Sequence, residues 1–160
     1  AVPDAPESMY EPLVARYRHH FLAQDQAIPL FEGARETIAE LHGAGYWLGV
    51  ATGKNRAGLD RALASTGLKK YFHATRTADQ TFSKPDPAML FELMDELAVS
   101  VERALMIGDT THDVQMAQNA KVDVVAVGHG AHPPEQLQEL NPLALVKDFA
   151  ELRAWLMANA

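Results

Sequence analysis

The sequence contains no cysteine. A disulfide framework is therefore excluded, and a cytoplasmic location is the default expectation. No apolar run approaches the length of about 18 residues that a membrane-spanning helix needs. The chain also does not open with a basic and then apolar signal segment. We therefore expect no membrane partner.

Basic residues are also scarce, because 14 Lys and Arg face 21 Asp and Glu, which gives a formal net charge of −7. Such a chain is poorly suited to neutralise a nucleic-acid backbone, so nucleic acid is not an expected partner. With 160 residues, of which 48% are apolar, the chain suits one domain with one core. It opens at Ala1 in a proline-dotted polar stretch that resembles mid-protein sequence, so we expect a fragment.

Apolar segments of two kinds alternate along the chain. Short continuous apolar runs predict strands, and longer segments with apolar residues three or four apart predict helices. The predicted strands are 47–51, 73–78, 104–108, 123–127 and 144–146, and the predicted helices are 8–24, 33–42, 55–65, 87–97, 112–119, 134–140 and 149–158. This alternation predicts an α/β fold with a Rossmann-like parallel sheet and helices on both faces.

Several conspicuous side chains have ordinary structural interpretations. Trp47 and Trp155 are expected in the core or on a helix face, and Met89, Phe91 and Met94 are expected to pack. The seven histidines are not spaced as metal ligands and no cysteine accompanies them, so zinc is not predicted.

The polar residues that directly follow predicted strands are the candidates for chemistry, because ligands of open parallel sheets bind beyond the carboxyl ends of the strands. Thr52-Gly53-Lys54-Asn55 follows the first strand. A hydroxyl, a flexible glycine and free backbone N–H groups there could bind an anionic oxygen. Alternatively, Thr52 or Asn55 only caps the next helix.

A lysine framed by prolines follows in Ser83-Lys84-Pro85-Asp86-Pro87. The prolines hold Lys84 stiffly at a loop-to-helix junction. Its ammonium could neutralise a phosphate or a pair of carboxylates there. The alternative is a solvated surface lysine.

Two carboxylates lie one helical turn apart in Gly108-Asp109-Thr110-Thr111-His112-Asp113. Asp109 and Asp113 offer hard oxygen ligands that suit one Mg²⁺ ion. The alternative is a helix cap with a first-turn acid that the helix dipole favours. Since the hydroxyl, the lysine and the acids all follow strands, we expect the side chains at 52, 84, 109 and 113 to converge on one pocket for an anion and a cation.

With these motifs in this order, the sequence resembles the haloacid-dehalogenase-like hydrolase superfamily, in its phosphoglycolate phosphatase-like branch. The matching segments are 49–54, 83–87 and 107–113, which correspond to the second, third and fourth family motifs. Residues 29–33 look like the return from a helical cap into the core. Gly128-His129-Gly130 resembles the family's Gly-x-Gly turn beside the active site, with a simple turn as the alternative.

The resemblance implies roles for the candidate residues. Thr52 and Lys84 would be catalytic, and together with Gly53 they would bind the phosphate. Asp109 would be a direct Mg²⁺ ligand, and Asp113 would complete the metal site by positioning that aspartate or its waters. These roles suit a reaction in which catalysis is mostly positioning and charge neutralisation.

The family's nucleophile is missing, since the sequence has no Asp-x-Asp pair. By the resemblance, residues 1–28 would be the remnant of a helical cap, and 29–160 the core without its first strand. That strand would lie between the strands ending in Thr52 and Asp109, so its absence predicts two unpaired edges. The protein's own missing N-terminal segment, or another copy of the chain, would fill the gap.

The leading hypothesis is a Mg²⁺-dependent phosphatase of this family that acts on a small phosphorylated metabolite, present here without its nucleophile and therefore inactive alone. A non-catalytic regulatory module that binds phosphate and Mg²⁺ is the alternative. A phosphoacceptor receiver domain fits less well, because its phosphorylated aspartate precedes the hydroxyl and the lysine, whereas here Thr52 comes first and the acids come last.

Overall fold

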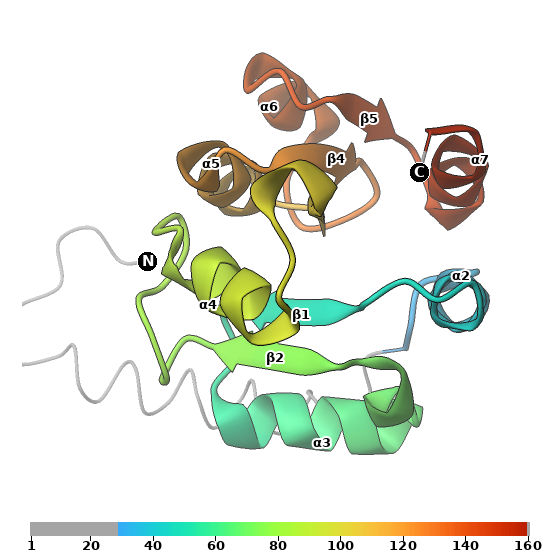
Figure 1. Cartoon of the computed structure of the whole chain (residues 1–160). Coiled ribbons are helices and arrows are strands. Elements are labelled where there is room, and N and C mark those ends of the chain that lie inside the picture. Colours follow the sequence, from blue (N-terminus) through green and yellow to red (C-terminus); the bar gives the residue numbers. More distant parts are fainter. Residues whose placement is uncertain (1–28, 160) are drawn as a thin grey trace, which may run out of the picture.

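The computed structural model describes residues 29–159. The helix predicted over 8–24 and the cap remnant predicted over 1–28 lie outside this range. The elements are α2 (Ala34–Gly43), β1 (Gly49–Thr52), α3 (Arg56–Thr66), η2 (Lys69–Tyr71), β2 (Ala74–Thr77), α4 (Ala88–Leu97), η3 (Val101–Arg103), β3 (Leu105–Gly108), α5 (Thr111–Ala120), β4 (Asp123–Val127), α6 (Pro134–Glu139), β5 (Ala144–Val146) and α7 (Phe149–Asn159) (Figure 1). Every strand and helix predicted within this range is present. None of these helices is long and apolar enough to cross a membrane.

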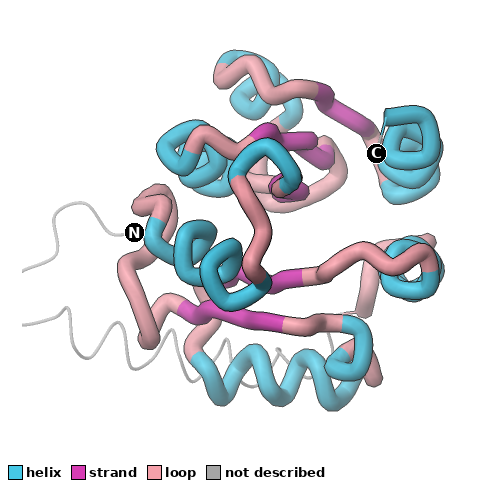
Figure 2. The backbone as a smooth tube through the Cα atoms, in the orientation of Figure 1, coloured by secondary structure: helices cyan, strands magenta, loops and turns pink. Residues whose placement is uncertain are grey.

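The strands form two parallel sheets (Figure 2). One pairs β1 with β2, and the other has the order β3-β4-β5. Within residues 29–159 no ladder joins β1 to β3, so each of these two strands has one unpaired edge. The two unpaired edges expected from the sequence are therefore observed.

Strand β4 shows why the chain needs helices on both faces. Val124 and Ala126 belong to a cluster with buried residues of α4, α5 and α6, whereas Val125 and Val127 belong to a cluster with α7. All four side chains are almost completely buried. A strand that is apolar on both faces is typical of a parallel sheet between two helical layers, which confirms the predicted fold class.

The two sheets are joined by side-chain packing. Ala51 of β1 packs against the same cluster of α4 and α5 residues that covers Val124 of β4. On the other face, Ile38 of α2 packs against a cluster formed by Leu59, Leu63 and Leu68 on and just after α3, and Leu41 packs against the α7 cluster. Helices therefore bridge the gap between β1 and β3 on both sides.

Trp47 lies at the surface, so its expected place in the core or on a helix face is wrong. Its side chain is 61% exposed, and β1 begins only at Gly49. The Trp47 ring lies 4.8 Å from the ring of His73, whose Nδ1 accepts a hydrogen bond from the Leu48 N–H. Residues 47 and 48 thus enter the strand along the surface. Trp155, in contrast, packs against the α7 cluster as expected.

The expectation that Phe91 packs in the interior is also wrong, because its side chain is 48% exposed. The buried face of α4 consists of Met89, Leu90 and Leu93, and Met94 packs beside it as expected. Phe91 is one residue beyond Leu90 and two before Leu93, which turns its side chain off this face of a helix with 3.6 residues per turn.

We predict that Met116→Ala lowers the free energy of unfolding by about 2–5 kcal/mol, because it opens a cavity in a core that does not collapse fully. Met116 is fully buried between α5 and its neighbours. The matched control is Met157→Ala in α7, where the side chain is 70% exposed and the expected change is within about 0.5 kcal/mol. Urea unfolding would measure both, and equal effects would contradict the assigned core.

Candidate active site

Helix α5 begins with a capping box that fixes Asp113. The Thr110 hydroxyl accepts a hydrogen bond from the Asp113 N–H at 3.2 Å, and Asp113 Oδ2 accepts from the Thr110 N–H at 3.0 Å. The same oxygen accepts from the Thr110 hydroxyl and from the Asp109 N–H. The capping interpretation of this motif is therefore correct, and Asp113 joins the helix start to the end of β3.

Asp113 also forms an ion pair with Lys84. The Lys84 Nζ lies 2.5 Å from Asp113 Oδ1, with side-chain exposures of 16% and 5%. Lys84 is therefore not a solvated surface lysine. Because Asp113 Oδ2 is taken by the capping box, both of its oxygens have protein donors. Capping and charge neutralisation are thus two functions of one buried carboxylate.

The loop that carries Lys84 is anchored on both sides. The Lys84–Pro85 peptide bond is cis. Asp86 Oδ1 accepts a hydrogen bond from the Ala88 N–H at the start of α4, and the Asn119 side chain of α5 donates to the Pro85 carbonyl at 3.0 Å. The lysine is therefore held relative to both helices that flank it.

Gly108 allows β3 and α5 to approach closely. A Cβ atom at this position would lie 2.3 Å from the Cβ of Asp113. Any side chain there would push Asp113 out of its place, so the glycine before Asp109 is required by this close contact.

Asp109 has one engaged and one available carboxylate oxygen. Its Oδ2 accepts a hydrogen bond from the Ala131 N–H at 2.8 Å. No residue of the described range donates to its Oδ1. Among residues 29–159, no three His, Cys, Asp or Glu side chains gather in a way that could hold a metal ion.

Thr52 and Gly53 lie at the end of β1, in the other sheet. The Thr52 hydroxyl accepts from the Lys54 N–H at 3.2 Å, whereas Asn55 caps α3 by accepting from the Gly58 N–H at 2.8 Å. The predicted cap is therefore Asn55. Within residues 29–159 no hydrogen bond or ion pair joins Thr52 to Lys84, so their convergence on one pocket stays a prediction.

The Thr52 loop and the Lys84 loop are nevertheless tied together. The Ala78 N–H donates to the Lys54 carbonyl at 3.1 Å, and both Asp79 oxygens accept from the Arg56 N–H. The Thr77 hydroxyl donates to Asp79 Oδ1 at 2.6 Å. This hydroxyl, followed by the backbone N–H groups, lowers the pKa of the Asp79 carboxyl below its ordinary value.

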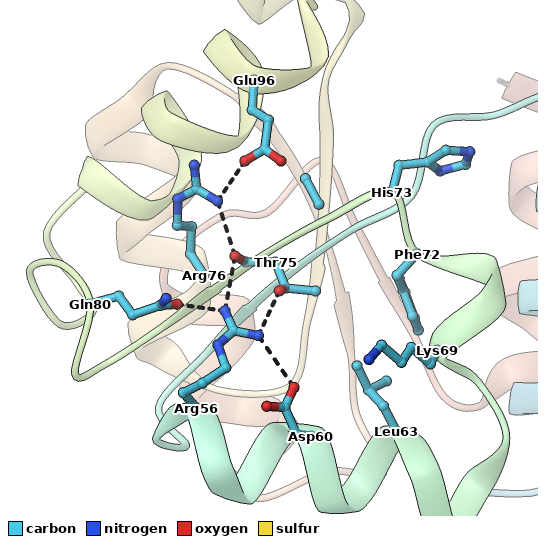
Figure 3. A pocket seen from close by; sticks show the side chains of 11 residues that line it. Arg56, Asp60, Leu63, Lys69, Phe72, His73, Thr75, Arg76, Gln80 and Glu96 are labelled. Carbon is cyan, nitrogen blue, oxygen red and sulfur yellow. Dashed lines mark hydrogen bonds and ion pairs between the residues drawn. The ribbon is translucent and has the colours of Figure 1, made fainter.

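A cavity of about 390 Å³ lies elsewhere, along the outer edge of β2 (Figure 3). The Arg56 guanidinium donates there to the Thr75 hydroxyl and carbonyl and to the Gln80 side chain. Arg76 forms ion pairs with Glu92 and Glu96. Both guanidinium groups thus have partners within the fold. None of Thr52, Lys84, Asp109 and Asp113 lines this cavity, so it is not the candidate active site.

The structure thus brings together three of the predicted residues, namely Lys84, Asp109 and Asp113. Sequence reasoning missed Ala131 and Asn119, whose contacts form across long stretches of chain. The Gly-x-Gly turn at 128–130 was the only sequence signal near Ala131.

A protein-family model matches most of the chain. The model of the haloacid dehalogenase-like hydrolase family matches residues 2–127, a range that contains all the site residues named above except those of the 128–132 turn. This chain is therefore a member of the haloacid dehalogenase-like hydrolase family.

The curated relatives are phosphatases by name. The chain is 34% identical over 155 residues to a phosphoglycolate phosphatase of Rhodospirillum rubrum, covering 96% of this chain and 64% of that protein. It is 32% identical over 152 residues to a phosphoglycolate phosphatase of Agrobacterium fabrum, covering 93% and 64%. It is 30% identical over 144 residues to the pyrophosphatase PpaX of Halalkalibacterium halodurans, covering 89% and 67%. The chain therefore spans about two thirds of the length of these relatives.

Solved structures share the fold. A predicted phosphatase from Clostridium acetobutylicum matches with a TM-score of 0.85 at 23% identity, covering 97% of this chain and 73% of that one. A HAD family hydrolase from Deinococcus radiodurans R1, solved with bound phosphate and sodium, matches with a TM-score of 0.79 at 22% identity, covering 96% and 68%. These matches support the α/β fold.

We predict that Lys84→Met lowers the free energy of unfolding by about 3 kcal/mol, because it leaves the buried Asp113 carboxylate without its cation. The double variant Lys84→Met/Asp113→Asn should recover much of that loss. Lys147→Met, at an exposed lysine, is the control and should change little. Chemical denaturation of the parent, the single variants Lys84→Met and Asp113→Asn, and the double variant would give the coupling energy, and a coupling near zero would contradict a stabilising ion pair.

We also predict a pH signature for Asp79. Its folded-state pKa is lowered, so the carboxylate adds stability above its unfolded value of 3.8, and this stability is lost as the pH falls through the folded-state value. Asp79→Asn should therefore be less stable than the parent at pH 7, with the difference shrinking in acid. Asp95→Asn, at an exposed aspartate, is the matched control. Thermal unfolding across pH would test this, and a difference independent of pH would refute it.

Proposed function

We propose that this chain is the phosphate- and Mg²⁺-binding part of a phosphatase, a phosphoric monoester hydrolase, that acts on a small phosphorylated metabolite in the cytoplasm. The observation that carries the proposal is the Lys84–Asp113 ion pair beside Asp109. It presents a fixed ammonium next to a carboxylate with one available oxygen. That combination suits a dianionic phosphate together with a divalent cation.

The residues present fit Mg²⁺. This ion keeps several waters and takes one or two protein carboxylates together with substrate phosphate oxygens. Asp109 Oδ1 is available as a direct ligand, whereas both oxygens of Asp113 are engaged, so Asp113 would position Asp109 and bound water. When bound, Mg²⁺ would neutralise charge on the transferring phosphoryl group.

The chain's own residues supply the rest of the charge stabilisation. Lys84 would neutralise phosphate oxygens as a point charge whose position Asp113 fixes. Thr52 and Gly53 would bind phosphoryl oxygens through the hydroxyl and the backbone N–H at the end of β1. In phosphoryl transfer such positioning and electrostatic stabilisation provide most of the catalysis.

The nucleophile would come from a strand that pairs with both β1 and β3. The two unpaired edges support this proposal, since a parallel strand between them would satisfy their backbone groups. Its carboxyl end would then lie between Thr52 and Asp109. We propose that the missing N-terminal segment of the same protein provides this strand with an Asp-x-Asp motif, and the greater length of the relatives supports that source. A second copy of the chain could pair with the two edges, but it would not supply the nucleophile, because its sequence has no Asp-x-Asp pair.

The substrate proposal rests on the relatives. Two of them are named phosphoglycolate phosphatases and one a pyrophosphatase, so a small phosphorylated compound is the expected substrate class. A non-catalytic module that binds phosphate and Mg²⁺ is the alternative function. It is favoured by the absence of any Asp-x-Asp pair from the sequence.

We predict that the 160-residue chain alone shows Mg²⁺-dependent phosphatase turnover no better than background, because it lacks the nucleophile. The full gene product, with an Asp-x-Asp strand, should release phosphate from small phosphate esters. Asp109→Asn in that protein should lower kcat by about 100-fold, as loss of one charge-stabilising group does. Asp95→Asn should leave kcat unchanged.

Phosphate release measured with and without Mg²⁺ distinguishes the hypotheses. Robust turnover by the 160-residue chain, checked by mass spectrometry, would contradict its expected inactivity. A full gene product that contains no Asp-x-Asp strand, or that binds phosphate without releasing it from esters, would favour the regulatory module.

A further inference from the structure

We propose that the loop of residues 128–132 positions Asp109 for the cation, with His132 as a positioning residue. This inference deepens the proposed function and rests on it. The loop follows β4 and contacts Asp109 twice: the Ala131 N–H donates to Oδ2 at 2.8 Å, and the His132 N–H donates to the Asp109 carbonyl at 3.2 Å. Both the side chain and the backbone of Asp109 are therefore held from this side.

His132 also binds the start of α5. Its Nδ1 accepts a hydrogen bond from the Thr111 N–H at 3.1 Å, and the Thr111 hydroxyl lies at the same distance. Thr111 is the first residue of α5, so its N–H has no partner within the helix. Through this bond the loop is attached to the helix that carries Asp113. Asp109 is thus enclosed between Asp113 on one side and the loop on the other.

Gly130 makes the approach of the loop possible. A Cβ atom there would lie 2.1 Å from the Cβ and 2.2 Å from the Oδ2 of Asp109. Gly130 does not have a positive φ angle, so its backbone conformation does not require a glycine. The close contact with Asp109 does. The glycine turn therefore has a function in the site, beyond reversing the chain.

The other end of the loop is fastened to the second sheet. The Gly128 N–H donates to the Val146 carbonyl at 2.8 Å, and the His129 Nδ1 lies 2.9 Å from the Lys147 carbonyl. The His129 ring also packs against Phe31, with 4.3 Å between ring centroids. These anchors hold the loop against β5, so it can serve as a fixed support for Asp109.

The loop influences which carboxylate oxygen of Asp109 would bind a cation. The Ala131 N–H bonds to Oδ2, whereas Oδ1 has no donor among residues 29–159, so we expect the carboxylate to bind a cation through Oδ1. Hydrogen bonds of this kind orient metal ligands, and their loss typically weakens metal binding by about 10- to 100-fold. We therefore expect the loop to influence cation affinity without touching the ion.

Two pairs of variants test this proposal. Gly130→Ala places a methyl group against Asp109, whereas Gly43→Ala is its control, since a Cβ at Gly43 would meet nothing within 4 Å. His132→Ala removes the acceptor for the Thr111 N–H, whereas His132→Asn keeps an acceptor near the position of Nδ1. All four are made in the 160-residue chain.

The first measurement is amide hydrogen exchange by NMR in EDTA, which needs no metal. His132→Ala should speed exchange at Thr111 and Ala131 by at least about tenfold. The Thr111 N–H loses its acceptor, and the loop that holds the Ala131 N–H against Asp109 loses its attachment to α5. His132→Asn should restore protection, and Gly43→Ala should leave it unchanged. Unchanged exchange at Ala131 in both His132→Ala and Gly130→Ala would overturn the proposal.

The second measurement is Mn²⁺ binding followed by electron paramagnetic resonance, with Mg²⁺ competition and with the melting temperature in EDTA recorded in parallel. Gly130→Ala and His132→Ala should weaken Mn²⁺ binding by about 10-fold or more. Lower melting temperatures with unchanged Mn²⁺ affinity would indicate a merely structural role and overturn the inference. A parent chain that binds no Mn²⁺ would instead refute the proposed metal site, and the exchange rates would still decide whether the loop holds Asp109.

Discussion

The buried carboxylate of Asp113 is the constraint on which the rest of the site depends. A charge with 3% exposure must be neutralised and hydrogen-bonded, and here Lys84 and the capping box of α5 do both. Meeting that requirement fixes the start of α5, the end of β3 and the lysine loop relative to one another. Asp109 is held in place as a consequence, because its N–H donates to the same carboxylate.

The division of the strands into two sheets gives the fold its second defining feature. Packing of α2 on one face and of α4 on the other joins the sheets, although no backbone ladder connects β1 to β3. Side-chain packing is non-directional, so it can hold the layers together across a gap, whereas backbone hydrogen bonds cannot. The unpaired edges belong to the strand that ends at Thr52 and to the strand that ends just before Asp109, which relates the sheet topology to the proposed chemistry.

The chain belongs to the haloacid dehalogenase-like hydrolases, and its contacts show how the candidate site residues are held. These contacts hold the lysine and the two aspartates in two different ways. Lys84 and Asp113 stabilise each other, whereas Asp109 is supported from its other side by the loop that follows β4. The tie between Asp79 and the Arg56 backbone connects the two loops that carry Thr52 and Lys84.

The sequence by itself determined the order of strands and helices and the Asn55 and Thr110 regions as helix starts, because periodicity and capping are local properties of the chain. It also identified Lys84 and Asp113 as candidate site residues. Only the tertiary structure decided what depends on distant contacts. The Lys84–Asp113 pair joins residues 29 positions apart, and the Asp109–Ala131 bond joins residues 22 apart. The exposure of Trp47 and Phe91 was likewise decided by which faces the neighbouring elements cover, and no local pattern contains that information.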